Sequence, residues 1–232
     1  MSDSAFLSLM LDGPLQSWGF ASRFERRTTG LHPTKSGIAG MICAALGAAK
    51  ESTDERGILD GLARSPMLSV SIPRQGFEGR ELPLRRLEDY HTVMGTRLAS
   101  GKPNSNAVLS RREYLLDGRF GVVIQGSRGL LESVAGALAN PVWGMWLGRK
   151  SCIPAAPILR GLFATEQEAL RVLIGERELS EFTTVREVAA FGDGSDSFSD
   201  QALSFGRPSS SGVEGRAFGM RRVLLTPAIQ RR

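Results

Sequence analysis

The order of secondary-structure signals in the first third of the chain is the feature that most constrains its fold. Residues 5–11 predict a buried strand, because they form a short apolar run that Asp12-Gly13-Pro14 ends. A helix is expected next, capped by Thr34 or Ser36 and running to about Ala48. The capping box Ser52-x-x-Glu55 then opens a helix to about Arg64, and residues 67–72 alternate as a strand does.

Predicted strands and helices continue to follow one another after an interruption at residues 74–112. Residues 113–125 predict a strand or hairpin with a turn at Asp117-Gly118. Residues 130–139 predict a helix, and 158–163 a strand. This order of elements is the split β-α-β or ferredoxin-like pattern, which RNA-recognition modules also use. We therefore expect an α+β protein whose residues 1–165 form a ferredoxin-like unit.

The C-terminal part predicts a small, β-rich extension at residues 166–232, packed on that unit. Its helix begins at the capping box Thr165-x-x-Glu168, and strands are expected at 180–188 and 216–225. Between them, residues 192–200 are rich in Gly, Ser and Asp and predict a solvated loop. Three aspartates there lack the spacing of a calcium loop: Asp193, Asp196 and Asp200.

Composition favours an anionic partner. The 232 residues include 25 Arg and 4 Lys, and the formal net charge is +5. Arginine binds phosphate bidentately and stacks on bases, which suits RNA, although a GC-rich genome produces the same bias. Much of the charge lies in residues 74–112, where eight basic residues face four acidic ones. That segment is expected to protrude as an insertion; a solvated loop is the alternative.

Other classes of site find little support in the sequence. Cys43 and Cys152 cannot form a disulfide framework or a four-ligand zinc site, and His32 and His91 are too few for a histidine metal site. We expect no metal and no cofactor. The chain lacks a secretion signal and the roughly 20 apolar residues of a membrane helix, so a cytoplasmic protein is predicted.

Two motifs suggest a grip on single-stranded nucleic acid. Gly13-Pro14-Leu15-Gln16-Ser17-Trp18-Gly19 offers a tryptophan face on which a base could stack. Pro33-Thr34-Lys35-Ser36-Gly37-Ile38 offers a helix start with free N–H groups, two hydroxyls and a lysine, which suits a phosphate. Trp18 could instead be a half-buried packing residue. A P-loop is excluded, because Thr34 stands where its glycine is required.

His91 is the candidate for acid–base chemistry. With Tyr90 or Lys102 nearby, it could take the proton of an RNA 2′-hydroxyl. The structural alternative is that Tyr90 and His91 stack or hydrogen-bond at the root of the insertion.

Five sequence blocks, in order, resemble the CasD family, the fifth core CRISPR-associated subunit, in its type I-E (Cascade) form. They are Gly13-Pro14-Leu15-Gln16-Ser17-Trp18-Gly19, Pro33-Thr34-Lys35-Ser36-Gly37-Ile38, Asp89-Tyr90-His91-Thr92-Val93, Arg112-Glu113-Tyr114-Leu115 and Leu147-Gly148-Arg149-Lys150-Ser151-Cys152. The resemblance implies a RAMP protein with a ferredoxin-like palm, a thumb-like insertion at about 74–112 and no catalytic residues. In the related I-C branch the equivalent subunit cuts RNA, which keeps an endoribonuclease using His91 as the alternative.

The resemblance also implies partners and a binding site. The subunit is expected to grip the 5′ handle of the CRISPR RNA (crRNA), to cap the backbone subunits and to contact the large subunit, and through it indirectly the target DNA. The residues expected to bind RNA are Gln16, Ser17, Trp18, Arg23, Thr34, Lys35, Ser36, Tyr90, His91, Arg97, Arg111, Arg112, Arg149, Lys150 and Ser151.

Overall fold

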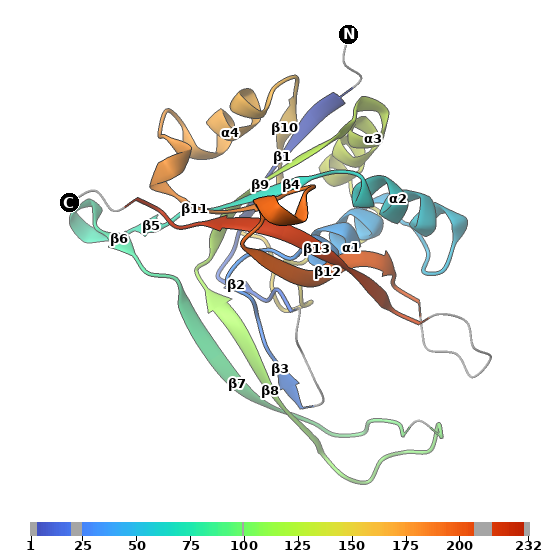
Figure 1. Cartoon of the computed structure of the whole chain (residues 1–232). Coiled ribbons are helices and arrows are strands. Elements are labelled where there is room, and N and C mark those ends of the chain that lie inside the picture. Colours follow the sequence, from blue (N-terminus) through green and yellow to red (C-terminus); the bar gives the residue numbers. More distant parts are fainter. Residues whose placement is uncertain (1–3, 20–24, 99, 207–214, 230–232) are drawn as a thin grey trace.

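The predicted N-terminal strand lies inside a large antiparallel sheet. The computed structural model describes residues 4–19, 25–98, 100–206 and 215–229. Within them, seven strands pair in the order β10-β1-β9-β4-β11-β13-β12 (Figure 1). Their bounds are β1 (Ser4–Asp12), β4 (Met67–Ser71), β9 (Arg119–Ser127), β10 (Leu159–Phe163), β11 (Thr183–Glu187), β12 (Asp196–Ser204) and β13 (Ala217–Thr226). The α+β class is confirmed.

Helices cover both faces of this sheet. They are α1 (Lys35–Leu46), α2 (Thr53–Ala63), α3 (Arg128–Ala139) and α4 (Glu166–Ile174). Successive side chains of a strand point to opposite faces. Leu9 therefore packs with α1 and α3, whereas Met10 packs with Ala169 and Leu173 of α4. One strand thus supplies two hydrophobic cores.

Local sequence signals predicted these helices well. Helix α3 begins two residues before its predicted start, and α4 has the full capping box of Thr165 and Glu168. Ser52 caps α2 as predicted, but the Glu55 carboxylate accepts from the Glu51 N–H and so does not complete the box. The predicted alternation of β4 is confirmed, since Leu68, Val70 and Ile72 all lie in the α4-side core.

The C-terminal segment continues the main sheet. Strand β11 pairs with β4, and β13 and β12 follow it outward. The prediction of a solvated loop at 192–200 is wrong: after a short 3-10 turn (Phe191–Asp193), β12 begins at Asp196, and Asp200 is fully buried. The sequence of residues 192–200 gave no sign of the strand, because Gly, Ser and Asp favour turns locally. Pairing with β13 determines the structure instead.

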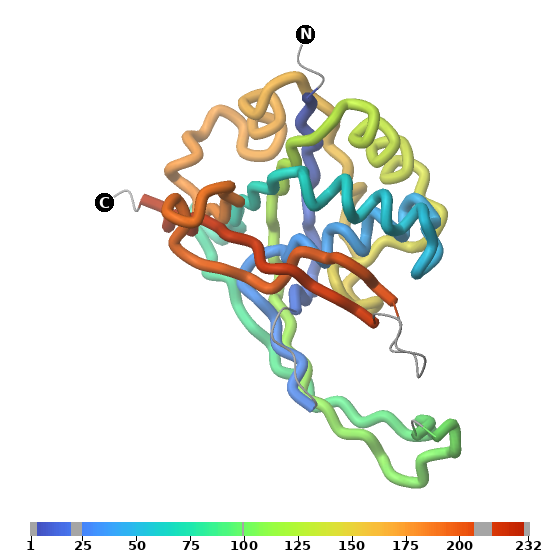
Figure 2. Tube along the Cα trace, turned by 45° about the vertical axis from the view of Figure 1, so that its right-hand side comes forward, coloured from blue at the N-terminus to red at the C-terminus, as the bar shows by residue number. Residues whose placement is uncertain are grey.

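A long hairpin projects away from this sheet, as predicted for the insertion (Figures 1 and 2). We call β7 (Arg85–Val93) and β8 (Val108–Leu116), with the segment between them, the arm. Two short strands flank the root of β8: β2 (Leu15–Gln16) antiparallel and β3 (Arg26–Arg27) parallel. Before the arm come β5 (Arg74–Gln75), a 3-10 turn (Phe77–Gly79) and β6 (Glu81–Leu82).

The strand or hairpin expected at 113–125 is in fact two strands in two sheets. Strand β8 belongs to the arm and β9 to the main sheet. The chain changes sheet at Asp117, whose φ of 53° lies in the left-handed region. The predicted turn is therefore present, but it connects arm and main sheet and closes no hairpin.

Helix α1 approaches the core closely at Gly37. A Cβ at this position would lie 2.9 Å from Cε3 and Cζ3 of Trp18. Gly57 of α2, in contrast, has nothing within 4 Å of the same position. The two helical glycines thus differ in their surroundings alone.

We expect Gly37→Ala to destabilise the chain by about 1–3 kcal/mol, because an added methyl overpacks the core. Gly57→Ala is the matched control and should stabilise by about 0.5–1 kcal/mol through helix propensity. Denaturant midpoints measure both. Equal stabilisation by the two substitutions would contradict the packing of Trp18 on α1.

Candidate nucleic-acid interface

The predicted tryptophan platform is part of the core. Trp18 is 1% exposed, its Nε1–H donates to Gln16 Oε1 at 2.9 Å, and its ring packs on Gly37. Gln16 is also fully buried. The expectation of an exposed stacking face on Trp18 is therefore wrong, because the indole has both an apolar partner and a hydrogen-bond acceptor inside the protein.

The residues beside Trp18 are also used internally. The Gln16 Nε2 group donates to the backbone carbonyls of Leu11 and Gly118 at 3.0 and 2.6 Å. The Ser17 hydroxyl donates to the Glu113 carbonyl at 3.2 Å, and Ser17 is 5% exposed. The loop thus ties β1 to the root of the arm, and direct contact of Gln16 with RNA is excluded in this conformation.

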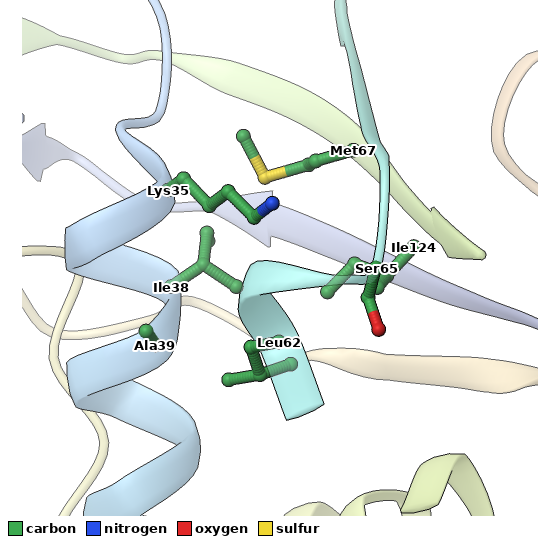
Figure 3. Close-up of a pocket in the computed structure, with 7 residues that line it drawn as sticks. All are labelled: Lys35, Ile38, Ala39, Leu62, Ser65, Met67 and Ile124. Carbon is green, nitrogen blue, oxygen red and sulfur yellow. The ribbon is translucent and has the colours of Figure 1, made fainter. Parts of the chain in front are cut away.

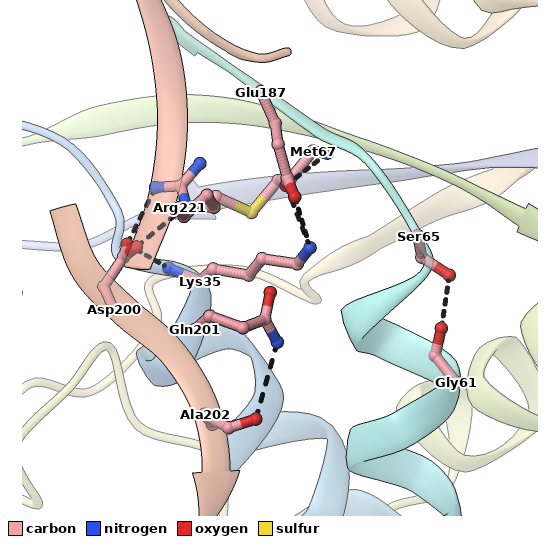
Figure 4. A network of polar contacts seen from close by, with 9 residues as sticks. All are labelled: Lys35, Gly61, Ser65, Met67, Glu187, Asp200, Gln201, Ala202 and Arg221. Carbon is pink, nitrogen blue, oxygen red and sulfur yellow. Dashed lines mark hydrogen bonds and ion pairs between the residues drawn. The ribbon is translucent and has the colours of Figure 1, made fainter. Parts of the chain in front are cut away.

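The start of α1 is capped as predicted, but its N–H at Lys35 is not available to a ligand. Thr34 is the N-cap, and its Oγ1 accepts from Gly37 N. The Lys35 N–H, however, donates to Asp200 Oδ2 at 2.9 Å. Asp200 in turn accepts two bonds from Arg221, at 2.8 and 2.7 Å (Figure 4). A carboxylate of the chain itself occupies the anion site that was expected to hold a phosphate, and that expectation is wrong.

The Lys35 side chain is also bonded within the protein. It is 4% exposed, and its Nζ lies 2.9 Å from both oxygens of Glu187, which also accepts from Met67 N (Figure 4). Burial lowers the pKa of the Lys35 ammonium, and the Glu187 carboxylate opposes that shift. Lys35 therefore joins α1 to β11 and β4, and its prediction as an exposed phosphate contact is wrong.

A small cavity beside the Lys35 stem has a volume of about 10 Å³, roughly the room one water molecule needs (Figure 3). Its lining residues are Lys35, Ile38, Ala39, Leu62, Ser65, Met67 and Ile124. A nucleotide does not fit there.

Four arginines lie together where β3 meets β8. The parallel register places Arg26 beside Arg111 and Arg27 beside Arg112. Like charges directly opposite each other on a sheet repel. The two arginine pairs are therefore typical of a surface that binds an anion. Sequence analysis missed Arg26 and Arg27, whose only local signal is a pair of adjacent arginines.

The pleat separates the predicted arm residues onto two faces. We call the first the Arg27 face: Arg27, Asp89, His91, Ser110 and Arg112. Among the described residues, neither Arg27 nor Arg112 forms an ion pair, and the Arg112 Nε–H donates to Ser110 Oγ at 3.1 Å. Arg149, whose guanidinium lies 4.7 Å from the centre of the Tyr114 ring, adds a third positive charge on this side.

The opposite side, the Tyr90 face, consists of Arg26, Glu88, Tyr90, Arg111 and Glu113. Here Arg111 Nη1 lies 3.3 Å from Glu88 Oε1, and Glu113 accepts from Thr29 N. Two arginines thus share this face with two carboxylates. Tyr90 is 62% exposed.

His91 and Tyr90 lie on different faces, although they are adjacent in the sequence. His91 Nδ1 is 3.8 Å from Asp89 Oδ2 on its own face. Tyr90 therefore cannot assist His91 at one reacting group in this conformation, and the suggested stacking between them is not observed.

The other predicted contacts are scattered. Arg97 lies on the outer part of the arm, where its Nη1 donates to the Gly101 carbonyl. Lys150 is exposed near the Trp146 ring, and Ser151 beside it is also exposed. Ser36 is half-buried. Arg23 lies outside the described residues.

Arg149 connects three segments at the root of the arm. Its Nη1 donates to the Glu113 carbonyl at 3.0 Å, and its Nη2 donates to the Arg27 carbonyl at 2.7 Å. The tie thus joins β3, β8 and the loop that carries Arg149.

The described ranges show neither a metal cluster nor a membrane-spanning helix. No group of three or more His, Cys, Asp or Glu residues there could hold a metal ion. None of the helices in that part of the chain is long and apolar enough to cross a membrane.

Comparison with known proteins identifies the family. A family model described as CRISPR-associated protein (Cas_Cas5) matches residues 6–224. The chain belongs to this family. One relative, "CRISPR system Cascade subunit CasD" of Escherichia coli (strain K12), is 31% identical over 161 residues, which cover 68% of this chain and 70% of the relative. The resemblance to the CasD family is confirmed.

Solved structures agree with this assignment to the CasD family. A chain described as "CRISPR RNA-guided surveillance complex" has a TM-score of 0.71 and 25% identity, with 96% of this chain and 90% of that chain covered. A second, described as "Crystal structure of Cas protein", has a TM-score of 0.62 and 28% identity, with 96% and 95% covered.

Lys35→Ala should lower the free energy of unfolding by about 3–5 kcal/mol, because it leaves the Glu187 carboxylate without its cation. Lys150→Ala, at an exposed position, is the control and should change it by about 0.5 kcal/mol or less. Chemical denaturation measures both. Unchanged stability of the Lys35 variant, with a weaker salt dependence of RNA binding, would restore Lys35 as a phosphate contact.

Proposed function

We propose that this CasD-family chain is a non-catalytic, crRNA-binding subunit of a type I-E Cascade complex, and that it grips the 5′ handle of the guide RNA in the cytoplasm. The main sheet supports a ferredoxin-like palm, because its first four strands pair in the order β10-β1-β9-β4 with helices in the two crossovers. The names of the relative and of the structural neighbour support membership of an RNA-guided Cascade assembly. Within it, we infer crRNA, a backbone subunit and the large subunit as partners, and target DNA as an indirect one.

The observation that carries the RNA-binding site is the unpaired arginine row on the Arg27 face. Arg27 and Arg112 lie side by side without an ion pair among the described residues, and Arg149 is close to them. The Tyr90 face carries as many arginines on β3 and β8, but two carboxylates, Glu88 and Glu113, share that face, whereas the Arg27 face has one, Asp89. A phosphate chain therefore gains more on the Arg27 face.

The other expected contacts stay predictions around this surface. Tyr90 offers an exposed ring to a base from the opposite face, and Arg97 adds charge farther along the arm. Lys150 and Ser151 follow Arg149 in the same exposed loop.

A binding role without catalysis is favoured by the surroundings of His91. Metal-independent RNA cleavage needs a general base and a general acid at one phosphate. Tyr90, one of the two expected companions, lies on the other face, and the titratable group beside His91 is Asp89. The other expected companion, Lys102, lies in the segment between β7 and β8.

The two faces can be compared directly in RNA binding. The double variant Arg27→Ala/Arg112→Ala should weaken binding of handle RNA by at least about tenfold and reduce the salt slope by about 0.7 per arginine. The control is Arg26→Ala/Arg111→Ala, which removes the same charges from the same strands on the Tyr90 face and should have a much smaller effect. Fluorescence anisotropy over a range of salt concentrations measures both. A larger effect of the control would place the RNA on the Tyr90 face.

Catalysis is tested separately with repeat RNA. The purified chain, in excess and with EDTA, should leave the RNA intact, and His91→Ala should behave identically. Product analysis on a denaturing gel measures this. Cleavage by the wild type that His91→Ala abolishes would instead establish the endoribonuclease alternative.

A further inference from the structure

The backbone of the loop that carries Arg149 is held by contacts with the main body of the protein. Gly148 has φ +98°, and a Cβ at this position would lie 1.8 Å from the Ser17 carbonyl oxygen. Ser17 N donates to the Leu147 carbonyl at 3.0 Å, and Leu147 N donates to the Cys152 carbonyl at 2.7 Å. The backbone on either side of Arg149 is thereby fixed to the main body of the protein.

The Arg149 side chain donates two hydrogen bonds to the protein backbone. Its two terminal nitrogens bind the Arg27 and Glu113 carbonyls, and its plane lies near the Tyr114 ring. These two carbonyls belong to β3 and β8 at the arginine row. A planar guanidinium can bind two carbonyls at once, whereas a lysine ammonium lacks this rigid fork.

Strand β3 needs such a tie. It has two residues, and its register opposes Arg27 to Arg112; the carboxylate on this face, Asp89, lies on the other side of Arg112, in β7. Besides the ladder pairing of β3 with β8, the bonds between this segment and β8 include Arg111 N to the Glu25 carbonyl, at 2.9 Å, and Thr29 N to the Glu113 carboxylate, at 3.2 Å. Without Arg149, repulsion between the paired arginines acts against these contacts.

We propose that Arg149 is a positioning residue for RNA binding: it holds β3 in register on β8, so that Arg27 and Arg112 present one surface to the same phosphates. This rests on the function proposed above. Arg149 then acts through the arginine row and makes no contact with RNA of its own, in contrast to the direct phosphate contact expected from the sequence.

A double-mutant cycle on the full chain tests this, with handle RNA as the probe. Arg149→Ala and Arg149→Lys should each weaken binding by about tenfold in the wild-type background. In the Arg27→Ala/Arg112→Ala background the same substitutions should cost less than about twofold, because the groups that Arg149 positions are gone. Lys150→Ala is the control for loss of a neighbouring cation, and its effect should be the same in both backgrounds.

The outcomes separate the inference from the function on which it rests. A full cost of Arg149→Ala in the double-variant background would show direct RNA contact, and retained affinity in Arg149→Lys would show a role of charge alone; either overturns the positioning role and leaves the proposed function intact. Wild-type binding by Arg27→Ala/Arg112→Ala would overturn both.

Hydrogen exchange of the free chain gives a readout without RNA. In Arg149→Lys, the amides of Thr29 and Arg111 should exchange faster, while amides in the β1–β9 ladder keep wild-type rates. Unchanged exchange at Thr29 and Arg111 would show that Arg149 does not hold β3, and general acceleration would show loss of global stability instead of local positioning.

Discussion

The pairing of β3 with β8 is the constraint on which the exposed surface of this protein depends. It sets Arg26 and Arg27 beside Arg111 and Arg112, against the mutual repulsion of four guanidinium groups. Backbone bonds, the Glu113 carboxylate and the Arg149 fork hold the register. Because the sheet is pleated, the arginines divide between two faces, and the carboxylates on the Tyr90 face leave the Arg27 face as the more positive one. A short strand of two residues thus decides where an anion can bind.

The interior uses charge in the opposite way. At the start of α1, Asp200 satisfies the Lys35 N–H and is held by Arg221, while Glu187 takes the Lys35 ammonium. Buried charges are tolerated when they are paired and hydrogen-bonded, and removal of one partner is costly. The residues that look like a phosphate grip therefore join the C-terminal strands to the helix. The exposed loop that contains Lys150 shares a surface with the arm, whereas Lys35 is buried.

Local signals in the sequence predicted much of the fold. The capping box at Thr165, the alternation of Leu68, Val70 and Ile72, and the apolar face of α3 all act within a few residues, and each is confirmed. Strand β12 was missed, since its Ser and Asp residues, and the glycines just before it, favour turns and its pairing partner lies in β13. The exposed stacking face expected of Trp18 was wrong for a similar reason: its neighbours Ser17 and Gly19 give no sign that Gly37, on helix α1, leaves room for its ring.

The sequence by itself determined the class of fold, the order of the elements, the protruding insertion and the family, because periodicity, caps and motif blocks are properties of neighbouring residues. Only the tertiary structure decided which of the basic residues are exposed. The burial of Lys35, the separation of Tyr90 from His91 and the meeting of Arg27 with Arg112 depend on strand register and on close backbone approach. These are relations between segments far apart in the chain. They are set by strand pairing and side-chain packing, which the composition of a single segment does not reveal.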